Sequence, residues 1–420
     1  MSKGSEQYQP EQGRGMARRS FLKGATGLAA GVAGAALLPP VAAAAMPADT
    51  TTRMVNRSVP TIRAMPKVLR SSRALGVTTT TNAPLPITQN GTTYQMAQET
   101  RWLDAEHFAI GRWDGSMSLF QFETAQYVGP LMVKAANDPA MQGVEMLTPL
   151  PGNAIATSND PSTIALWQAP GGDWTKLKLV NTVSYDPSLG YASAGAFVGA
   201  GGTKTLVVGH INGFLSLWNY APSTRTLTFL RSVNVQNPNP TNPFSDHTME
   251  DVVVADAAGS VVAAGSEDGY VTMMHVPSGT ILSQTVFNPI AQRGINALSI
   301  QGNRLLVANC SVGQADYNLW YYSINKSTWA ITLLDKRNLV IDTSLPQVFN
   351  FDVVWGRNAG APCWFASTEE GTLWMGDLNG NSLNPIGYEQ LTGPLGSALD
   401  YQDGKLVMVA YDIYQFSTAP

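Results

Sequence analysis

The chain has 420 residues and a formal net charge of −4, with only 13% charged residues and abundant Gly and Pro. Its length allows two or three domains, and this composition is typical of many short strands joined by turns. Acidic residues outnumber Lys and Arg in residues 77–420, which argues against a nucleic-acid partner because phosphates require basic neutralisation. The two cysteines, Cys310 and Cys363, form neither a disulfide framework nor a metal motif.

The beginning of the chain has the pattern of an export signal. Paired arginines at Arg18-Arg19 precede Phe21-Leu22-Lys23, a weakly apolar stretch rich in Gly and Ala, and small residues at Val41–Ala45. This arrangement resembles a twin-arginine (Tat) signal peptide over residues 1–45, which implies a bacterial protein that folds before export to the periplasm or the medium. We expect cleavage and no stable membrane span thereafter. The alternative is retention as an anchor, although Pro39 and Pro40 interrupt the apolar stretch.

Residues 46–83 show neither a helical nor a strand period. They are rich in Thr, Ser and Pro, and they carry several basic residues against Asp49. We expect a basic, flexible arm that is either a solvated linker or a tether for an acidic partner or a membrane. The remaining residues, 84–420, form the folded domain.

A repeated hairpin dominates residues 84–420. In its clearest copy Val261–Ala264 alternate, Asp268-Gly269 turn the chain, and alternation resumes at Tyr270, which is the pattern of a tight antiparallel hairpin. The turns fall near Asp114, Asp160, Asn212, Asp268, Asp316, Glu370 and Asp412. This spacing is that of four-stranded propeller blades with loop insertions. The seventh copy ends one strand short, and we expect the segment between Ala83 and Met96 to supply that strand.

The best-preserved copies resemble the WD40/YVTN family. Gly265-Ser266 with Asp268-Gly269, and the Leu-Trp pairs at Leu217-Trp218 and Leu166-Trp167, carry the resemblance. It implies an all-β fold, a seven-bladed β-propeller of four-stranded antiparallel blades that is closed by an N-terminal strand. The resemblance is specific for architecture and poor for function, since this fold hosts many functions.

The fourth copy comes nearest to the family pattern. His247, Ser266 and Asp268 stand at the offsets where the family places a structural hydrogen-bond network, and Met274 stands where its Trp would be. The other copies lack this His, so the resemblance implies that packing between sheets supplies most of the stability.

Loops after the second and fourth strands emerge on one face of such a ring and gather carboxylates and aromatic rings. We interpret this loop face as a binding surface for a protein or for a cationic or carbohydrate-like small ligand, or as a cation site. The alternative is that these Asp and Glu residues only form hairpin turns. The longest loops, Asn237–Asp251 and Tyr185–Gly195, are the favoured contact sites. The candidate binding residues are Trp113, Tyr185, Tyr191, His210, Phe244, His247, Glu250, Glu267, Asp316, Phe349, Glu369 and Glu370.

The sequence contains none of the common catalytic motifs. It has four histidines and lacks His-Glu-x-x-His, Cys-x-x-Cys-His and Gly-x-Ser-x-Gly, so zinc hydrolysis, c-type haem and hydrolase-elbow chemistry are unsupported. We nominate no catalytic residue and favour a monomeric, non-enzymatic binding platform. The alternative is a lactonase- or lyase-like propeller enzyme with carboxylates at the channel mouth. The sequence requires no cofactor, and calcium is possible at such a mouth.

Overall fold

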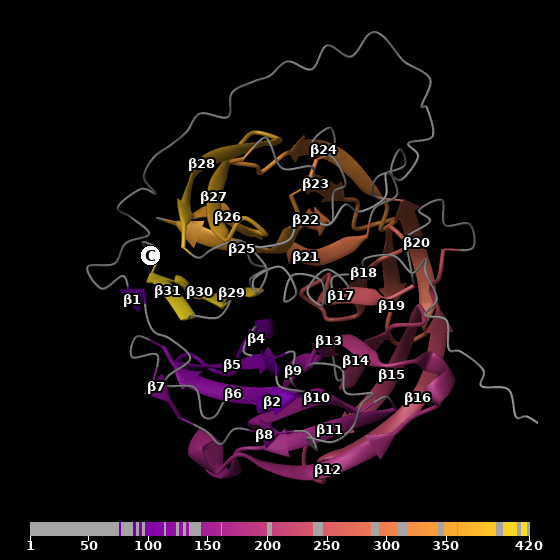
Figure 1. The fold of residues 1–420 in the computed structure, drawn as a ribbon. Coiled ribbons are helices and arrows are strands. Elements are labelled where there is room, and N and C mark those ends of the chain that lie inside the picture. Colours follow the sequence, from indigo (N-terminus) through magenta and orange to yellow (C-terminus); the bar gives the residue numbers. More distant parts are fainter. Residues whose placement is uncertain are drawn as a thin grey trace, which may run out of the picture.

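The structure of the protein is a computed structural model in which strands form seven sheets around a common centre (Figure 1). Apart from strands, the elements in the described residues are short 3-10 turns at Pro170–Gly172, Trp174–Lys176 and Pro187–Leu189. No helix in the described part of the chain is long and apolar enough to cross a membrane. The structure describes residues 75–76, 87–89, 92–94, 97–112, 115–122, 126–128, 132–133, 144–160, 162–199, 204–237, 247–286, 294–309, 317–342, 348–358, 360–391, 398–409 and 413–417.

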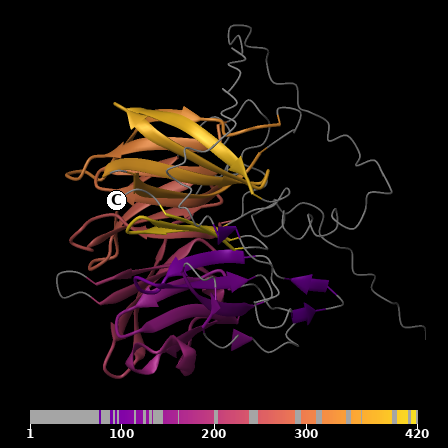
Figure 2. The same ribbon diagram turned by 90° about the vertical axis from the view of Figure 1, so that its left-hand side faces the viewer.

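Each sheet is an antiparallel blade whose first strand lies nearest the centre (Figure 1), and Figure 2 shows the ring of blades from its side. Blades one to three are formed by β4 (Ala97–Trp102), β5 (His107–Arg112), β6 (Ser116–Gln121), β7 (Gln126–Tyr127) and β8 (Met132–Val133), then β9 (Leu147–Leu150), β10 (Ala154–Asp160), β11 (Thr163–Gln168) and β12 (Lys178–Ser184), then β13 (Ala192–Val198), β14 (Thr205–His210), β15 (Phe214–Ala221) and β16 (Thr226–Asn234).

Blades four to seven follow the same plan. They are formed by β17 (Met249–Val254), β18 (Val261–Ser266), β19 (Tyr270–His275) and β20 (Thr280–Val286), then β21 (Ile295–Gln301), β22 (Arg304–Asn309), β23 (Leu319–Ile324) and β24 (Ile331–Arg337), then β25 (Asn350–Asn358), β26 (Ala361–Thr368), β27 (Thr372–Asn379) and β28 (Ser382–Gln390), and finally β29 (Ala398–Gln402), β30 (Lys405–Val409) and β31 (Ile413–Ser417). The predicted seven-bladed architecture is confirmed.

The apolar residues of the middle strands face two neighbours at once. In β18, Val262 and Ala264 pack into a core shared with blade three, whereas Val261 and Ala263 pack into a core shared with blade five. Successive side chains of a strand point to opposite faces, so a sheet with neighbours on both sides needs apolar residues at every position. This requirement explains why the second strands are nearly continuous apolar runs.

The ring is closed by contact between the first and last blades. Consecutive inner strands touch in the order β4, β9, β13, β17, β21, β25 and β29, and β29 returns to β4. Between those two blades, Phe108 and Phe120 of blade one share a core with Val407 and Ile413 of blade seven. Each blade is therefore covered on both faces by another blade.

An N-terminal strand completes the last blade, but it lies earlier in the chain than predicted. The strand β1 (Leu75–Gly76) pairs with Tyr414 and Gln415 of β31. Residues 84–96, which were expected to close the ring, contain instead a separate hairpin of β2 (Ile87–Gln89) and β3 (Thr92–Tyr94). Asn90-Gly91, a pair that strongly favours a two-residue hairpin turn, separates these strands in the sequence, so they pair with each other.

Small residues near the end of the second strands allow close approach of the next blade. A Cβ atom on Gly265 would lie 2.6 Å from Cγ2 of Ile295 in blade five, and one on Gly209 would lie 2.7 Å from Cβ of Met249 in blade four. The recurrence of small residues at this position, visible in the sequence, thus reflects contact between blades.

The position of the closing strand can be tested by truncation. A chain lacking residues 1–70 should keep the melting temperature of the full chain, whereas a chain lacking residues 1–76 should melt a few degrees lower, because the lost backbone hydrogen bonds contribute about 1–3 kcal/mol and leave an open edge. Thermal unfolding by circular dichroism measures the difference. If the fall appeared only after removal of residues 84–96, the assignment of β1 would be wrong.

Candidate functional site

Polar side chains on the inner strands connect successive blades around a central channel. Asp251 of β17 accepts a hydrogen bond from the backbone N–H of Leu298 in blade five (2.7 Å). Asp352 of β25 accepts from Leu399 of blade seven (2.8 Å). Asp400 of β29 accepts from Trp102 of blade one (2.8 Å), across the ring closure. These carboxylates therefore hold neighbouring blades together at the centre.

Two hydroxyl groups make the same kind of connection. Ser299 of blade five accepts from the backbone N–H of Trp355 in blade six (2.9 Å). The hydroxyl of Ser193 in blade three donates to the carbonyl of Met249 in blade four (2.6 Å). Inner-strand side chains thus link each blade to the next, from blade three through blade seven and from blade seven to blade one.

Arg101 of β4 is the cation among the channel carboxylates. Its guanidinium lies 2.5 Å from Glu99 and 3.8 Å from Asp251. Burial by itself would lower the pKa of Arg101, but Glu99 and the three channel aspartates raise that pKa above its usual value. Burial also raises the pKa of Asp400, although Arg101 acts in the opposite direction. The channel therefore contains a charge cluster in which the guanidinium of Arg101 interacts electrostatically with several carboxylates.

The channel itself encloses about 400 Å³. Its lining includes Arg101, Thr148, Asp251, Asp352 and Asp400. Thr148 is only 3% exposed, and its hydroxyl oxygen has no hydrogen-bond partner in the described residues. A polar cavity with an unpaired hydroxyl is a suitable place for ordered water.

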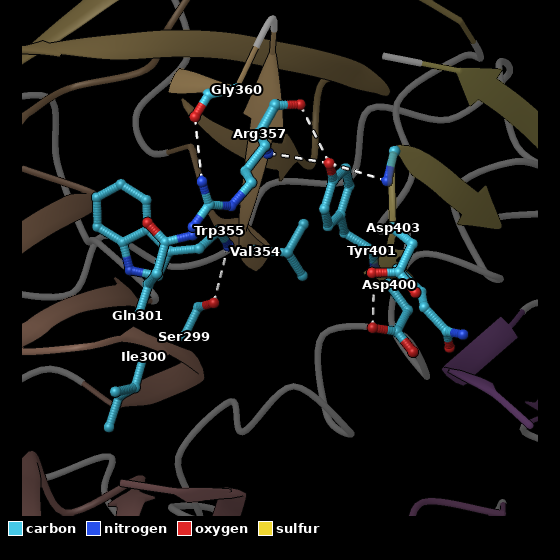
Figure 3. Close-up of a pocket in the computed structure, with 12 residues that line it drawn as sticks. Ser299, Ile300, Gln301, Val354, Trp355, Arg357, Gly360, Asp400, Tyr401 and Asp403 are labelled. Atoms are coloured by element: carbon cyan, nitrogen blue, oxygen red, sulfur yellow. Dashed lines mark hydrogen bonds between the residues drawn. The ribbon is translucent and has the colours of Figure 1, made fainter. Parts of the chain in front are cut away.

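A larger cavity of about 630 Å³ opens at one mouth of this channel, over blades five to seven. We call it the mouth cavity. It lies at the ends of β21, β25 and β29 and at the turns that follow β25 and β29, and Figure 3 shows its labelled side chains around one hollow. Its lining residues are Ser299, Ile300, Gln301, Val354, Trp355, Arg357, Gly360, Asp400, Tyr401, Gln402, Asp403 and Gly404.

Hydrogen bonds across blades fix the wall of the mouth cavity. The hydroxyl oxygen of Tyr401 lies 3.0 Å from the backbone N of Arg357 and 3.1 Å from its carbonyl oxygen. The same oxygen accepts from the N–H of Gly404 (3.0 Å), and the Tyr401 ring stacks on Phe365. These bonds are visible in Figure 3. The cavity is consequently preformed, as ligand sites usually are.

The residues predicted to bind a ligand belong to the opposite end of the blades. They follow second and fourth strands, whereas the mouth cavity follows first strands. Trp113, Phe244 and Asp316 lie outside the described residues. Tyr185, Tyr191, His210, Glu267, Phe349, Glu369 and Glu370 are each no more than 8% exposed, and only His247 and Glu250 are half-buried. The described members of this group are mostly interior side chains.

His210 belongs to a satisfied chain of hydrogen bonds in blade three. The indole N–H of Trp218 donates to the hydroxyl of Ser216 (2.8 Å), which lies 2.7 Å from Nε2 of His210. Nδ1 of His210 donates to the carbonyl of Gly190 (3.1 Å). Burial lowers the pKa of His210 to about 4, so the imidazole is neutral and structural at neutral pH.

The network implied by the family resemblance is present in blade four. Nδ1 of His247 lies 2.9 Å from Asp268, and the hydroxyl of Ser266 donates to the same carboxylate. Met274 occupies a position in the core, facing blade three. In blade two, the indole N–H of Trp167 donates to Thr157 (2.9 Å), which is a further fragment of the same arrangement.

The turn after β26 holds two adjacent buried carboxyl groups. Glu370 accepts hydrogen bonds from the backbone N–H groups of Ile341 and Asp342. Burial raises the pKa of Glu369 to about 8, with a smaller contribution in the same direction from Glu370. Burial also raises the pKa of Glu370, against the effect of its backbone hydrogen bonds. This pair makes the stability of blade six dependent on pH.

Within the described residues, no three His, Cys, Asp or Glu side chains gather closely enough to bind a metal ion. The side chains that line the mouth cavity, such as Trp355, Arg357 and Tyr401, were not identified from the sequence. No local motif distinguishes them, because their convergence depends on three blades meeting at the channel.

The comparisons with known proteins concern the fold. No family model and no curated protein matches the sequence. Similar solved structures are β-propellers. They include the RRP9 WD40 repeats, with a TM-score of 0.57, 12% identity, and coverage of 78% of this chain and 96% of that one. The Pan2 WD40 domain of Neurospora crassa has a TM-score of 0.55 and 10% identity, covering 77% and 89%.

A third similar structure is the Cps50 (Swd1) β-propeller domain of Myceliophteria thermophila, with a TM-score of 0.54 and 14% identity. It covers 78% of this chain and 100% of that domain. This chain has the fold of a WD40 β-propeller. At these identities the likeness establishes architecture, and the site must be argued from its own geometry.

The buried Glu369 leads to a pH prediction. Its folded pKa of about 8 exceeds the usual Glu value of about 4.3, so its contribution to stability is full at low pH and is lost as pH rises through 8. Between pH 9 and 7, above the range in which His210 titrates, the free energy of unfolding should rise as pH falls, by up to about 1.4 kcal/mol per pH unit. The melting temperature should rise with it.

Glu369→Gln should reduce that slope by at least half, while Glu106→Gln, at an exposed turn position, should leave it unchanged. Thermal unfolding at several pH values measures the slope. An equal slope in wild type and Glu369→Gln would show that Glu369 ionises normally.

Proposed function

We propose that the protein is a non-enzymatic binding platform that receives a protein partner at the mouth cavity. The preformed cavity of about 630 Å³ carries this proposal, because it combines side chains from three blades on a rigid ring. Its volume is in the range of sites that hold ligands, about 300–1,000 Å³. The WD40-type fold supports the proposal as an architecture with wide use in recognition.

The channel carboxylates support a structural role more than a catalytic one. Asp352 accepts hydrogen bonds from Val353 and Leu399, both at 2.8 Å. Asp400 accepts from Tyr401 and Trp102, also at 2.8 Å. A carboxylate with two backbone donors is held in place, and its oxygen atoms are already engaged in the contacts that join neighbouring blades. This favours the platform over the lactonase- or lyase-like alternative.

Site-specific photocrosslinking in the cells that make the protein tests the platform. A photoreactive residue placed at Gln402, in the mouth cavity, should form adducts with a partner protein. The same residue at Lys178, exposed on the outer strand of blade two, should form few or none. Gel shifts detect the adducts. Adducts equally frequent at both positions, or found only at Lys178, would contradict docking at the mouth.

We further propose that the protein works in the bacterial periplasm or outside the cell after twin-arginine export. The support is in the sequence, where Arg18-Arg19 and Phe21-Leu22-Lys23 precede a weakly apolar stretch. These residues lie outside the described part of the structure. We also propose residues 46–83 as an arm between the signal and the propeller, with β1 at its end.

Exchange of both arginines tests the export route. Arg18→Lys with Arg19→Lys keeps the positive charge but removes the paired guanidinium groups, so the full chain should remain in the cytoplasm of a bacterium with an active twin-arginine system. Cell fractionation and immunoblotting measure the distribution. Export of the double variant at the wild-type level would contradict this route.

A further inference from the structure

Arg357 presents a guanidinium group with unused hydrogen-bond donors at the mouth cavity. Its side chain is exposed, and one guanidinium nitrogen donates to the carbonyl of Gly360 (3.1 Å). In the described part of the chain it has no carboxylate partner. The remaining guanidinium donors are free to pair with a ligand, and Figure 3 shows the side chain within the cavity lining.

The charged residues near the mouth cavity differ in how far their polar groups are already engaged. Lys405, which begins β30, lies outside the cavity lining, and its ammonium group donates to the carbonyl of Ala105 in blade one (2.5 Å). Asp400 and Asp403 are the acidic residues of the lining, and Asp400 already accepts hydrogen bonds from the backbone N–H groups of Trp102 and Tyr401. Arg357 is therefore the cation of the lining whose donors remain available to an anionic group.

Trp355 supplies a second hydrogen-bond donor in the wall of the cavity. It is 6% exposed, and its indole N–H has no partner within the described residues. An unpaired buried N–H raises the free energy of the unliganded protein, and an oxygen atom of an occupant would relieve that cost. Ile300 and Val354 add apolar surface beside it, which suits the aliphatic part of a side chain.

The charge of the lining favours a monoanionic carboxylate over a phosphate group. Asp400 and Asp403 line the same cavity as Arg357. These carboxyl groups disfavour a dianion more than a single carboxylate, whereas planar guanidinium groups pair well with carboxylates. Glu and Asp side chains of a peptide have the required charge and size.

We propose that the mouth cavity binds an acidic peptide segment of a partner protein, with one carboxylate paired to Arg357 and near the indole N–H of Trp355. This proposal rests on the proposed function and adds the chemistry of the segment that is bound.

Nuclear magnetic resonance of the tryptophan indole groups tests the proposal directly in the full chain, which has ten Trp residues. Trp355→Phe identifies the resonance of Trp355 and removes only the N–H and part of the ring. The probe is a blocked Gly-Ser-Glu-Ser-Gly peptide, and its controls are the same peptide with Gln and inorganic phosphate. The Glu peptide should shift the Trp355 resonance and bind about tenfold or more tightly than the Gln peptide.

Two variants make the outcome specific. Arg357→Met keeps the length of an exposed side chain and should abolish the preference for Glu over Gln. Trp374→Phe is the matched control, because the indole N–H of Trp374 is also unpartnered among the described residues but lies away from the cavity. It should bind the Glu peptide as wild type does.

Equal binding of the Glu and Gln peptides, tighter binding of phosphate, or no shift at millimolar peptide would overturn the carboxylate assignment. If any of these results were found while photocrosslinks still formed at Gln402, docking of a partner protein at the mouth cavity would stand and the carboxylate assignment would fail. If photocrosslinks at Gln402 were absent as well, both proposals would fail.

Discussion

Hydrogen bonds from the backbone of one blade to an inner-strand side chain of the next are the interaction on which this ring depends. The inner strand of each blade lies nearest the centre and touches the inner strands of both neighbouring blades. The distance between one inner strand and the next therefore determines how the ring closes. Asp251, Ser299, Asp352 and Asp400 each accept an N–H from the following blade. Their geometry sets the spacing between blades and leaves a polar channel at the centre.

Such a ring brings several carboxylates close together, and Arg101 compensates for their repulsion. Partial burial of paired charges contributes little net stability, but removal of one partner is costly because the others remain uncompensated. We therefore interpret Arg101 and the channel carboxylates as a group that fixes how neighbouring blades are arranged. The channel carboxylates are thus part of the scaffold that joins neighbouring blades.

The two ends of the blades differ in how fully their polar side chains are hydrogen-bonded within the described residues. At the end that follows the second strands, buried networks such as Trp218-Ser216-His210 and Ser266-Asp268-His247 satisfy polar groups inside the fold. At the end that follows the first strands, short turns leave a cavity whose donors, on Arg357 and Trp355, are incompletely used. Recognition is more readily supported at the second of these ends, because unused donors are available there.

The sequence by itself determined the number of blades, the strand pattern of each and the network of blade four, because these depend on alternation and turns within about 50 residues. It also indicated closure by an N-terminal strand, but it placed that strand at residues 84–96, since the pairing of Leu75–Gly76 with β31 leaves no local pattern. Only the tertiary structure decided which carboxylates link blades and where the cavity opens. Trp102 and Asp400 are 298 positions apart and meet only when the ring closes, and the residues of the mouth cavity likewise come from three blades.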